Sequence, residues 1–170
     1  MFYVIDANVL CTADGLADHV SPECGMECGA FLRKVQRRHS VVVDGQDLIE
    51  GEWRKNLPPG MSVGWGFYLW VRDSRGNLKK RDEVQLTRVS PIDDTLLAEF
   101  PQDKRLAGFD ADDRKYVAAA LVSQHHPPIV NAVDPGYAAF AGPLSDAGVV
   151  VRELCPEQLK SGPPGKHSRR

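Results

Sequence analysis

Short apolar runs recur along this chain and predict buried strands. The first run, FYVI at 2–5, is aromatic and β-branched and stops at Asp6. Such runs are typical of strands that are buried on both faces of a sheet. Similar runs lie at 41–43, 129–133 and 149–151, and an alternating stretch at 84–89 predicts a half-exposed strand.

Longer segments between these runs carry apolar residues at helical intervals. They predict helices over 22–38, 47–57 and 110–124. Ser21 and Pro22 suit the N-cap and the first position of the first helix, and the Pro58-Pro59-Gly60 triplet ends the second. Residues 67–71 fit either a helix or a strand, and residues 74–77 fit a turn.

Strands that alternate with helices indicate a mostly parallel sheet with helices on both faces. The predicted fold class is therefore α/β, a three-layer α/β/α sandwich around about five strands. A chain of 170 residues suits one domain, which we place at residues 1–160. Residues 161–170 form a basic tail, expected to be a flexible end rather than a phosphate-binding arm.

The overall charge gives little reason to expect binding by bulk electrostatics. The net charge is −2, so the chain has no general positive field for nucleic acid. The apolar fraction of 42% and the charged fraction of 26% are ordinary for a globular protein. A hydrolase that acts on nucleic acid through a local acidic site stays compatible with these values.

The four cysteines are Cys11, Cys24, Cys28 and Cys155. We see no signal peptide and no apolar run of membrane-spanning length, so we expect a cytoplasmic protein with reduced thiols and no membrane partner. Cys24 and Cys28 would face one side of the first predicted helix, where packing is the expected role. A zinc site would need two more ligands, and His19 and His39 are the nearby candidates.

Four acids carry the candidate chemistry: Asp6, Glu52, Asp113 and Asp134. Asp6 and Asp134 directly follow predicted strands, and ligands of an open parallel sheet bind at the carboxyl ends of its strands. Clustered carboxylates repel one another, and this repulsion is offset by protons or by a cation. Ligands that are all oxygen favour Mg²⁺ or Mn²⁺, which can activate water against a phosphodiester.

Each acid also has a plain structural explanation. An aspartate in the first turn of a helix, such as Asp113, often interacts only with the helix dipole. Asp110 fits the N-cap of the same helix, bonding the amide of Asp113, and Asp6 could equally cap a turn after its strand. The interpretation as a site therefore depends on the four acids occurring together and in order.

The segments that hold these acids resemble the PIN-domain family of nucleases, in a toxin-like bacterial form. YVIDANVL is similar to the family's opening strand, and DGQDLIEGEWRKNL to its helix with a glutamate before an aromatic residue. FDADDRKYVAAAL resembles the D-x-x-D segment, and IVNAVDPGYAAF the strand end with the fourth acid. LSDAGVVVRELCPEQL is similar to the closing strand. Residues 58–105 do not match well.

The resemblance implies a nuclease that uses Mg²⁺ or Mn²⁺ and cleaves RNA, with single-stranded structured RNA ahead of DNA. It assigns catalytic and metal-binding roles to the four acids and selects Glu52 over Glu50. It implies that Asn8 and Asp110 support the site, although Asn8 could instead only close the turn after the strand. It also implies an antitoxin protein or a homodimer as partner.

The chain departs from the family pattern beside the fourth acid. Many family members have Thr or Ser where this chain has Val133, and a further Asp where it has Gly136. This departure keeps a second hypothesis open, a weak or inactive module that binds nucleic acid or regulates a partner. Candidate phosphate contacts are Arg54, Lys55, Arg114 and Lys115, which could equally form solvated helix faces.

Two other enzyme classes fit less well. A phosphatase of the haloacid-dehalogenase type requires a second Asp two residues after the first, where this chain has Asn8. A dinucleotide-binding fold would need a Gly-rich turn after the first strand, and residues 6–9 contain no glycine.

Overall fold

The computed structural model describes residues 1–17, 19–90 and 92–159. Its main sheet has five strands in the order β3-β2-β1-β6-β7, and every pair of neighbours is parallel. The strands are β1 (Phe2–Ile5), β2 (Ser40–Asp44), β3 (Arg81–Val84), β6 (Ile129–Asn131) and β7 (Val151–Glu153). A separate antiparallel hairpin consists of β4 (Arg88–Ser90) and β5 (Asp93–Leu97).

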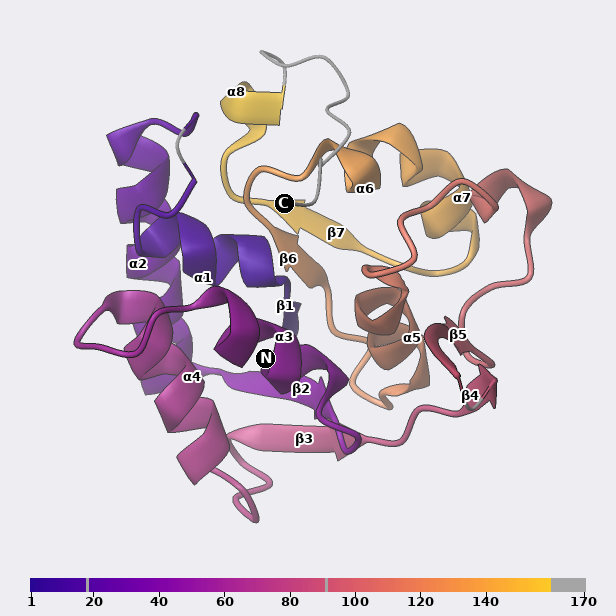
Figure 1. Ribbon diagram of the computed structural model, residues 1–170, viewed down its shortest axis with the longest axis horizontal. Helices are drawn as coiled ribbons and strands as arrows, with labels where there is room; N and C mark the ends of the chain where they lie inside the picture. Colours follow the sequence, from indigo (N-terminus) through magenta and orange to yellow (C-terminus); the bar gives the residue numbers. More distant parts are fainter. Residues whose placement is uncertain (18, 91, 160–170) are drawn as a thin grey trace.

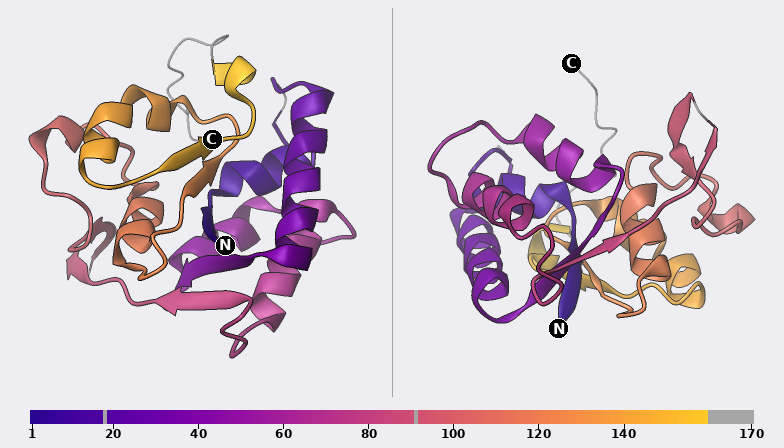
Figure 2. Two further views of the ribbon diagram at one scale, coloured as in Figure 1. Left: turned by 180° about the vertical axis from the view of Figure 1, so that it is seen from behind. Right: turned by 90° about the horizontal axis from the view of Figure 1, so that it is seen from below.

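Helices cover both faces of the main sheet (Figures 1 and 2). One side carries α1 (Ala7–Ala13), α2 (Pro22–Arg38), α3 (Leu48–Asn56) and α4 (Val63–Asp73). The other side carries α5 (Arg114–Val122), α6 (Pro135–Ala139) and α7 (Ala141–Asp146). The short helices η1 (Lys104–Leu106) and α8 (Pro156–Leu159) complete the described elements. This arrangement confirms the predicted three-layer α/β sandwich with a parallel five-stranded sheet.

The central strands are buried because their side chains meet helices on both faces. Every residue of β2 is buried, as are Tyr3, Val4 and Ile5 of β1. The apolar runs predicted this burial correctly, since a strand that is covered on both faces has no polar side. The helix predicted over 22–38 coincides with α2, where the Ser21 hydroxyl accepts the Cys24 amide and Pro22 opens the helix.

Several local predictions differ from the structure. The strand predicted at 84–89 is divided between β3 and β4, because residues 85–87 cross from the main sheet to the hairpin. The final strand lies at 151–153, two residues beyond its predicted start, after a turn at Gly148 with φ +87°. Residues 67–71 belong to α4, and α5 begins only at Arg114. The sequence did not predict α1, which follows β1 directly.

The expectation of reduced thiols is wrong for two cysteines. Cys24 of α2 and Cys155, which follows β7, form a disulfide although they are 131 residues apart. Cys11 and Cys28 are free thiols. The sequence could not pair Cys24 with Cys155, because only the return of the chain along β7 places its end against the start of α2. Disulfides are uncommon in reducing compartments, so this bond is expected to open where the surroundings are reducing.

None of the described helices has the length and apolar character needed to cross a membrane. The basic tail predicted for residues 161–170, like the end of the predicted domain at residue 160, falls outside the described residues.

The long disulfide loop leads to a prediction about stability. Replacing both bonded residues, as Cys24→Ser/Cys155→Ser, should lower the free energy of unfolding by about 3–5 kcal/mol, because the bond restricts the unfolded chain. Urea denaturation without reductant measures the change, and Cys11→Ser is the matched control. A dithiol reductant should bring the wild type close to the double variant. If the wild type and the double variant had equal free energies of unfolding without reductant, the prediction would be refuted.

Candidate functional site

Two of the four candidate acids lie where neighbouring parallel strands end. Asp6 follows β1 and caps α1, where its Oδ1 accepts the Asn8 amide at 2.9 Å. Asp134 follows β6 and caps α6, where its Oδ1 accepts the Gly136 amide at 2.6 Å. Because β1 and β6 pair in parallel, both carboxylates lie at the same edge of the sheet. Helix N-termini stabilise negative charge, which favours both positions.

Glu52 of α3 contacts two residues of α5 beside Asp6. Its Oε2 accepts the hydroxyl of Tyr116 at 2.5 Å and lies 2.8 Å from Nζ of Lys115. The Tyr116 oxygen also accepts the amide of Ala7, the residue after Asp6. Burial, with the charges of Asp6 and Glu52, raises the pKa of Tyr116 well above its ordinary value. Tyr116 therefore stays a neutral donor that joins α1, α3 and α5.

Asp6 is buried among groups that disfavour its charge. Burial is the main cause, followed by the charge of Glu52, and together they raise the pKa of Asp6 to about 7. Hydrogen bonds from the Asn8 amide and the Tyr137 hydroxyl, the latter at 2.8 Å, oppose this rise without cancelling it. Near neutral pH the Asp6 carboxyl is therefore ready either to hold a proton or to lose it to a cation.

Asp113 is affected more strongly. It directly precedes α5, and burial raises its pKa to about 10. The negative charges of the other three candidate acids and of Asp110 add to this rise. The structure therefore brings Asp6, Glu52, Asp113 and Asp134 into one electrostatically interacting group.

These carboxylates are close in electrostatic terms without being packed to ligand distance. Among the described residues, three ligand atoms of His, Cys, Asp or Glu lie within 4.8 Å of one another in one group only. This group consists of the sulfurs of Cys24, Cys28 and Cys155, and no three carboxylates of the described residues meet this limit. An ion among the carboxylates would therefore contact some of them through water. Magnesium commonly keeps several of its waters in protein sites.

Asn131 at the end of β6 holds the loop that carries Asp134. Its Oδ1 accepts Nδ2 of Asn8 at 2.8 Å, and its Nδ2 donates to the backbone oxygen of Asp134 at 2.8 Å and to Glu153 at 2.6 Å. Asn8 in turn accepts the amide of Ala132 at 2.8 Å. The Asn8 side chain thus joins the start of α1 to the end of β6 and orders the edge of the sheet, beyond closing its own turn.

A fifth carboxylate lies on the side of Asp134, from the end of β7. Burial raises the pKa of Glu153, and the charge of Asp134 adds to the rise. Gly136, where the resembling family often has an acid, has little room for a side chain. A Cβ there would lie 3.0 Å from Oδ1 of Asp134. The close contact between the Gly136 amide and the Asp134 carboxylate therefore suits glycine.

Glu50 lies apart from this group, in a different environment. Its side chain is 1% exposed, and its Oε2 lies 2.6 Å from the Arg81 guanidinium of β3. Arg75 approaches the same oxygen at 3.6 Å. Glu50 is therefore a core residue, because α3 turns this side chain inward against β3. Glu52 is the residue of the two that contacts Tyr116 and Lys115.

Asp44 shows that an acid at the end of a buried strand need not belong to a site. It is the last residue of β2, but its two oxygens accept the amides of Gln46, Leu48 and Ile49 at 2.8–2.9 Å. Its carboxylate therefore caps the start of α3. The sequence around Asp44 gives no sign that its role differs from that of Asp6.

Asp110 does not cap α5 as predicted. Its side chain accepts the amide of Asp112 at 2.9 Å, and its backbone oxygen accepts the amide of Asp113 at 3.3 Å. The chain makes a turn here before the helix starts, which moves the N-cap to Asp113. The charge of Asp110 contributes to the raised pKa of Asp113.

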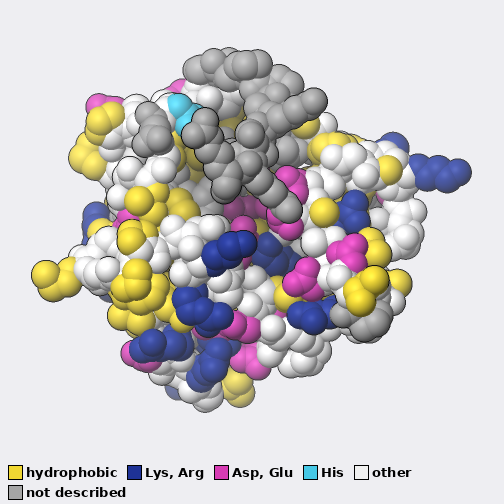
Figure 3. All heavy atoms as spheres, in the orientation of Figure 1, with side chains coloured by type: hydrophobic (Ala, Val, Ile, Leu, Met, Phe, Trp, Pro, Cys, Tyr) yellow, Lys and Arg dark blue, Asp and Glu magenta, His cyan; other side chains and the backbone are white. Residues whose placement is uncertain are grey.

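The four candidate phosphate contacts have different surroundings. Lys115 pairs with Glu52, and its Nζ also donates to the backbone oxygen of Asp112. The guanidinium of Arg114 lies over the Phe100 ring, 5.0 Å from its centre. Arg54 pairs with Asp47 at 2.8 Å, and Lys55 is exposed. Figure 3 shows acidic and basic side chains interspersed over the visible described surface, without a field of one sign.

Sequence reasoning missed Tyr116, Tyr137, Asn131 and Glu153. Tyr116 and Tyr137 lie on helical faces that look like ordinary core, and only tertiary contact shows that their hydroxyls bond carboxylates. Asn131 left a usable signal, since it is a polar residue inside the apolar run IVNAV. A buried polar side chain needs partners, and Asn131, with none of its side chain exposed, finds three.

No protein-family model, curated protein or solved structure matches this chain. The chemistry of the site is that of an all-oxygen acidic group, with two phenols and two amides that hold the acids in place.

The buried pair of Glu50 and Arg81 leads to a prediction. Glu50→Gln should lower the free energy of unfolding by about 2–3 kcal/mol, because it removes the buried counter-charge of the Arg81 guanidinium, which then keeps only the more exposed Glu83 at 2.9 Å. Glu52→Gln should cost less, since Glu52 is partly exposed and packed among other acids. Denaturant titration of both variants tests the ranking. A larger loss for Glu52→Gln would contradict the assignment of Glu50 to the core.

A second prediction concerns pH and the metal-free protein. The pKa of Asp6 is 3.8 without perturbation and about 7 when folded, so folding becomes less favourable as pH rises through this interval. Asp6→Asn should remove this loss and stabilise the protein above pH 7 by a few kcal/mol, at about 1.4 kcal/mol per pKa unit. Thermal unfolding from pH 4 to 8 in chelator measures it. A variant that is less stable than the wild type at pH 8 would contradict the prediction.

Proposed function

We propose that this protein is a metal-dependent nuclease of the PIN type that hydrolyses RNA at the acidic edge of its sheet. One observation supports the proposal above the others. Four acids from separate parts of the chain interact at this edge, and burial and mutual repulsion raise the pKa of Asp6 to about 7 and of Asp113 to about 10. A protein that needed only stability would gain by replacing them.

The residues at this edge fit a hard divalent cation. All donors are oxygens, which Mg²⁺ and Mn²⁺ prefer to the softer sulfur and nitrogen ligands. Asp6, Glu52, Asp113 and Asp134 would hold the ion, partly through water. The ion would supply an activated water and neutralise charge on the phosphodiester. Its binding would also displace the protons that the raised pKa values of Asp6 and Asp113 retain.

The chain's own groups position the acids for this role. Tyr137 donates to Oδ2 of Asp6, whose Oδ1 accepts the Asn8 amide, and Tyr116 donates to Oε2 of Glu52. These bonds fix the two carboxylates, and each oxygen keeps a lone pair for a cation or a bound water. Asn8 and Asn131 hold the Asp134 loop against α1. Lys115 neutralises Glu52 in the metal-free protein and would be free to meet a phosphate when a cation replaces it.

The substrate and partners follow from the family resemblance. Single-stranded structured RNA is proposed ahead of DNA, with action in the cytoplasm, and an antitoxin protein or a second copy of the chain as partner. Lys115 pairs with Glu52 and Arg54 pairs with Asp47. Lys55 and Arg114 are the candidate phosphate contacts that form no ion pair with an acid among the described residues.

A second candidate is a PIN-like module that binds nucleic acid without cleaving it. The ion pair between Lys115 and Glu52 favours this alternative, since a lysine already partly occupies the role of the cation. The carboxylates also lie further apart than a close ligand group. Turnover in the presence of a divalent cation separates the two candidates.

Metal dependence is the test of the proposed activity. Cleavage of a single-stranded RNA should require Mg²⁺ or Mn²⁺ and stop in EDTA. Asp6→Asn and Glu52→Gln should each lower the rate by about a hundredfold or more at saturating Mn²⁺, because each removes a charge that holds the ion. Glu23→Gln, an exposed acid of α2, is the matched control and should change it less than about threefold. Full activity in EDTA would refute the metal mechanism.

If neither ion supports cleavage, while the wild type still binds the RNA and Asp6→Asn binds equally, the non-catalytic module is the better description. Calorimetric titration with Mn²⁺ provides the independent measurement, since a nuclease site should lose ion binding in Asp6→Asn.

A further inference from the structure

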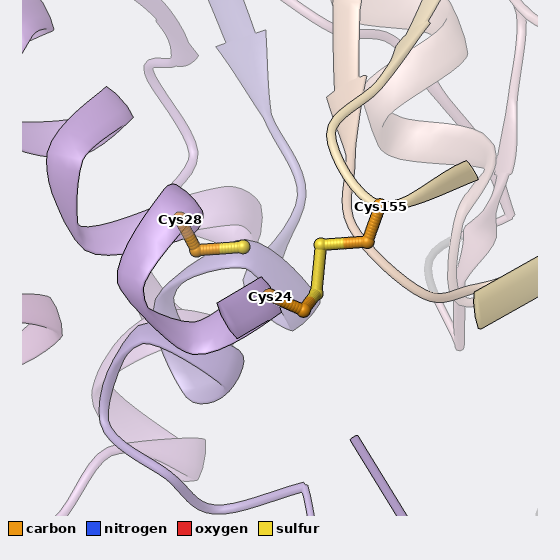
Figure 4. A group of neighbouring side chains, drawn as sticks. All are labelled: Cys24, Cys28 and Cys155. Atoms are coloured by element: carbon orange, nitrogen blue, oxygen red, sulfur yellow. A yellow bond between two sulfur atoms is a disulfide. The ribbon is translucent and has the colours of Figure 1, made fainter. Parts of the chain in front are cut away.

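A second group of potential ligands lies away from the acidic edge. The sulfurs of Cys24, Cys28 and Cys155 all lie within 4.8 Å of one another. Cys24 and Cys28 are one turn apart on α2, and Cys155 approaches from the segment after β7. Figure 4 shows the Cys28 sulfur pointing toward the disulfide of the other two. All three side chains are buried, with at most 2% exposed.

We propose that reduction of the Cys24–Cys155 disulfide converts this group into a three-thiolate site for a soft d¹⁰ cation, Zn²⁺ or Cu⁺. The oxidised and the metal-bound forms exclude each other, because the same two sulfurs serve in both. The site does not depend on the proposed nuclease activity and shares no residue with it.

The geometry suits such an ion. A zinc–sulfur bond of about 2.3 Å places the sulfurs of a thiolate site about 3.8–4.0 Å apart. The observed limit of 4.8 Å is therefore within about 1 Å of the required separation once the disulfide opens. The C-x₃-C spacing of Cys24 and Cys28 falls within the usual range for zinc ligands. Thiolates also select Zn²⁺ and Cu⁺ over Mg²⁺.

The presence of the third sulfur separates this group from an ordinary structural disulfide. A disulfide uses two cysteines, and Cys28 contributes nothing to it, yet its sulfur lies beside the pair and is turned toward it. Once reduced, three thiols would lie together in an apolar environment. A cation that replaces their protons would join α2 to the β7 segment, as the disulfide does.

The chemistry balances with a dithiol reductant. The reductant gives two electrons to the sulfur–sulfur bond, becomes a disulfide itself, and passes two protons to Cys24 and Cys155. The ion then forms three bonds to sulfur, and the three thiols release three protons to solvent. Oxidation of the same two sulfurs, with two electrons passing to an oxidant, expels the ion and restores the bond.

The two ions differ in the number of ligands they need. Among the described residues no fourth His, Cys, Asp or Glu joins the group. Cu⁺ is satisfied by three thiolates, whereas Zn²⁺ takes four ligands and would need a water in the fourth position. The thiolate chemistry is common to both, and separate titrations decide which ion binds more tightly.

The experiment is an anaerobic titration of the full chain with Zn²⁺, with Co²⁺ as its coloured substitute, and with Cu⁺. Reduced wild type should bind one ion per chain more than oxidised wild type does and show a sulfur-to-metal charge-transfer band, which carboxylate sites do not give. Oxidised wild type should show no band. Cys28→Ser should weaken binding by at least about tenfold and reduce the band, while Cys11→Ser, a free thiol outside the group, should match the wild type.

Folding of the Cys28→Ser variant is checked separately by air oxidation, after which a thiol count should show that the Cys24–Cys155 bond has formed. If that variant fails to fold, the comparison of oxidised and reduced wild type decides the matter. Absence of a charge-transfer band with all three ions in reduced wild type would overturn the proposal. An unchanged band and affinity in folded Cys28→Ser would overturn it as well.

Discussion

The parallel pairing of β1 with β2 on one side and β6 on the other is the constraint on which the site depends. Because neighbouring parallel strands end at the same edge, the residues after β1 and β6 are brought together despite their separation in sequence. Asp6 and Asp134 occupy these positions, and α3 and α5 add Glu52 and Asp113 from the adjoining layers. Helices cover these strands on both faces, so the acids lie where the strands leave the apolar core.

The acids are held at this edge against their mutual repulsion. The raised pKa values of Asp6 and Asp113 indicate that the metal-free fold is less favourable with both of these carboxyl groups ionised. The hydroxyls of Tyr116 and Tyr137, the helix N-termini at Asp6 and Asp134, and the ammonium of Lys115 reduce this cost without removing it. Such an arrangement is typical of functional sites, where stability is given up for chemistry.

Acids elsewhere in the chain show what the same residue types do when only structure is required. Both carboxylate oxygens of Asp44 accept backbone amides at or just before the start of α3, and Glu50 forms an ion pair with the buried Arg81. Each has a partner that neutralises it or satisfies it with hydrogen bonds. The acids of the candidate site differ because they have more carboxylates than counter-charges around them. The cluster of Cys24, Cys28 and Cys155, between α2 and the segment after β7, is a second centre with different chemistry.

The order of residues was enough to predict the fold class, the α2 helix with its Ser21 cap, and the strand-end positions of Asp6 and Asp134. These features depend on local periodicity and on the general rule that parallel strands end at one edge, both of which are visible in the order of residues. The choice of Glu52 over Glu50 needed a family resemblance, because both flank the apolar face of one helix. The structure separates them by turning Glu50 toward Arg81.

The contacts between side chains that are far apart in the sequence are visible only in the folded chain. Tyr116 contacts Glu52, Asn131 contacts Asn8, and Cys155 contacts Cys24, yet no local pattern shows which residue each one contacts. The reason is physical, since a helical repeat shows which face is buried but not what lies against it. Electrostatics follow the same rule, because the pKa of Asp113 depends on burial and on charges that are distant in sequence and become neighbours only when the sheet assembles.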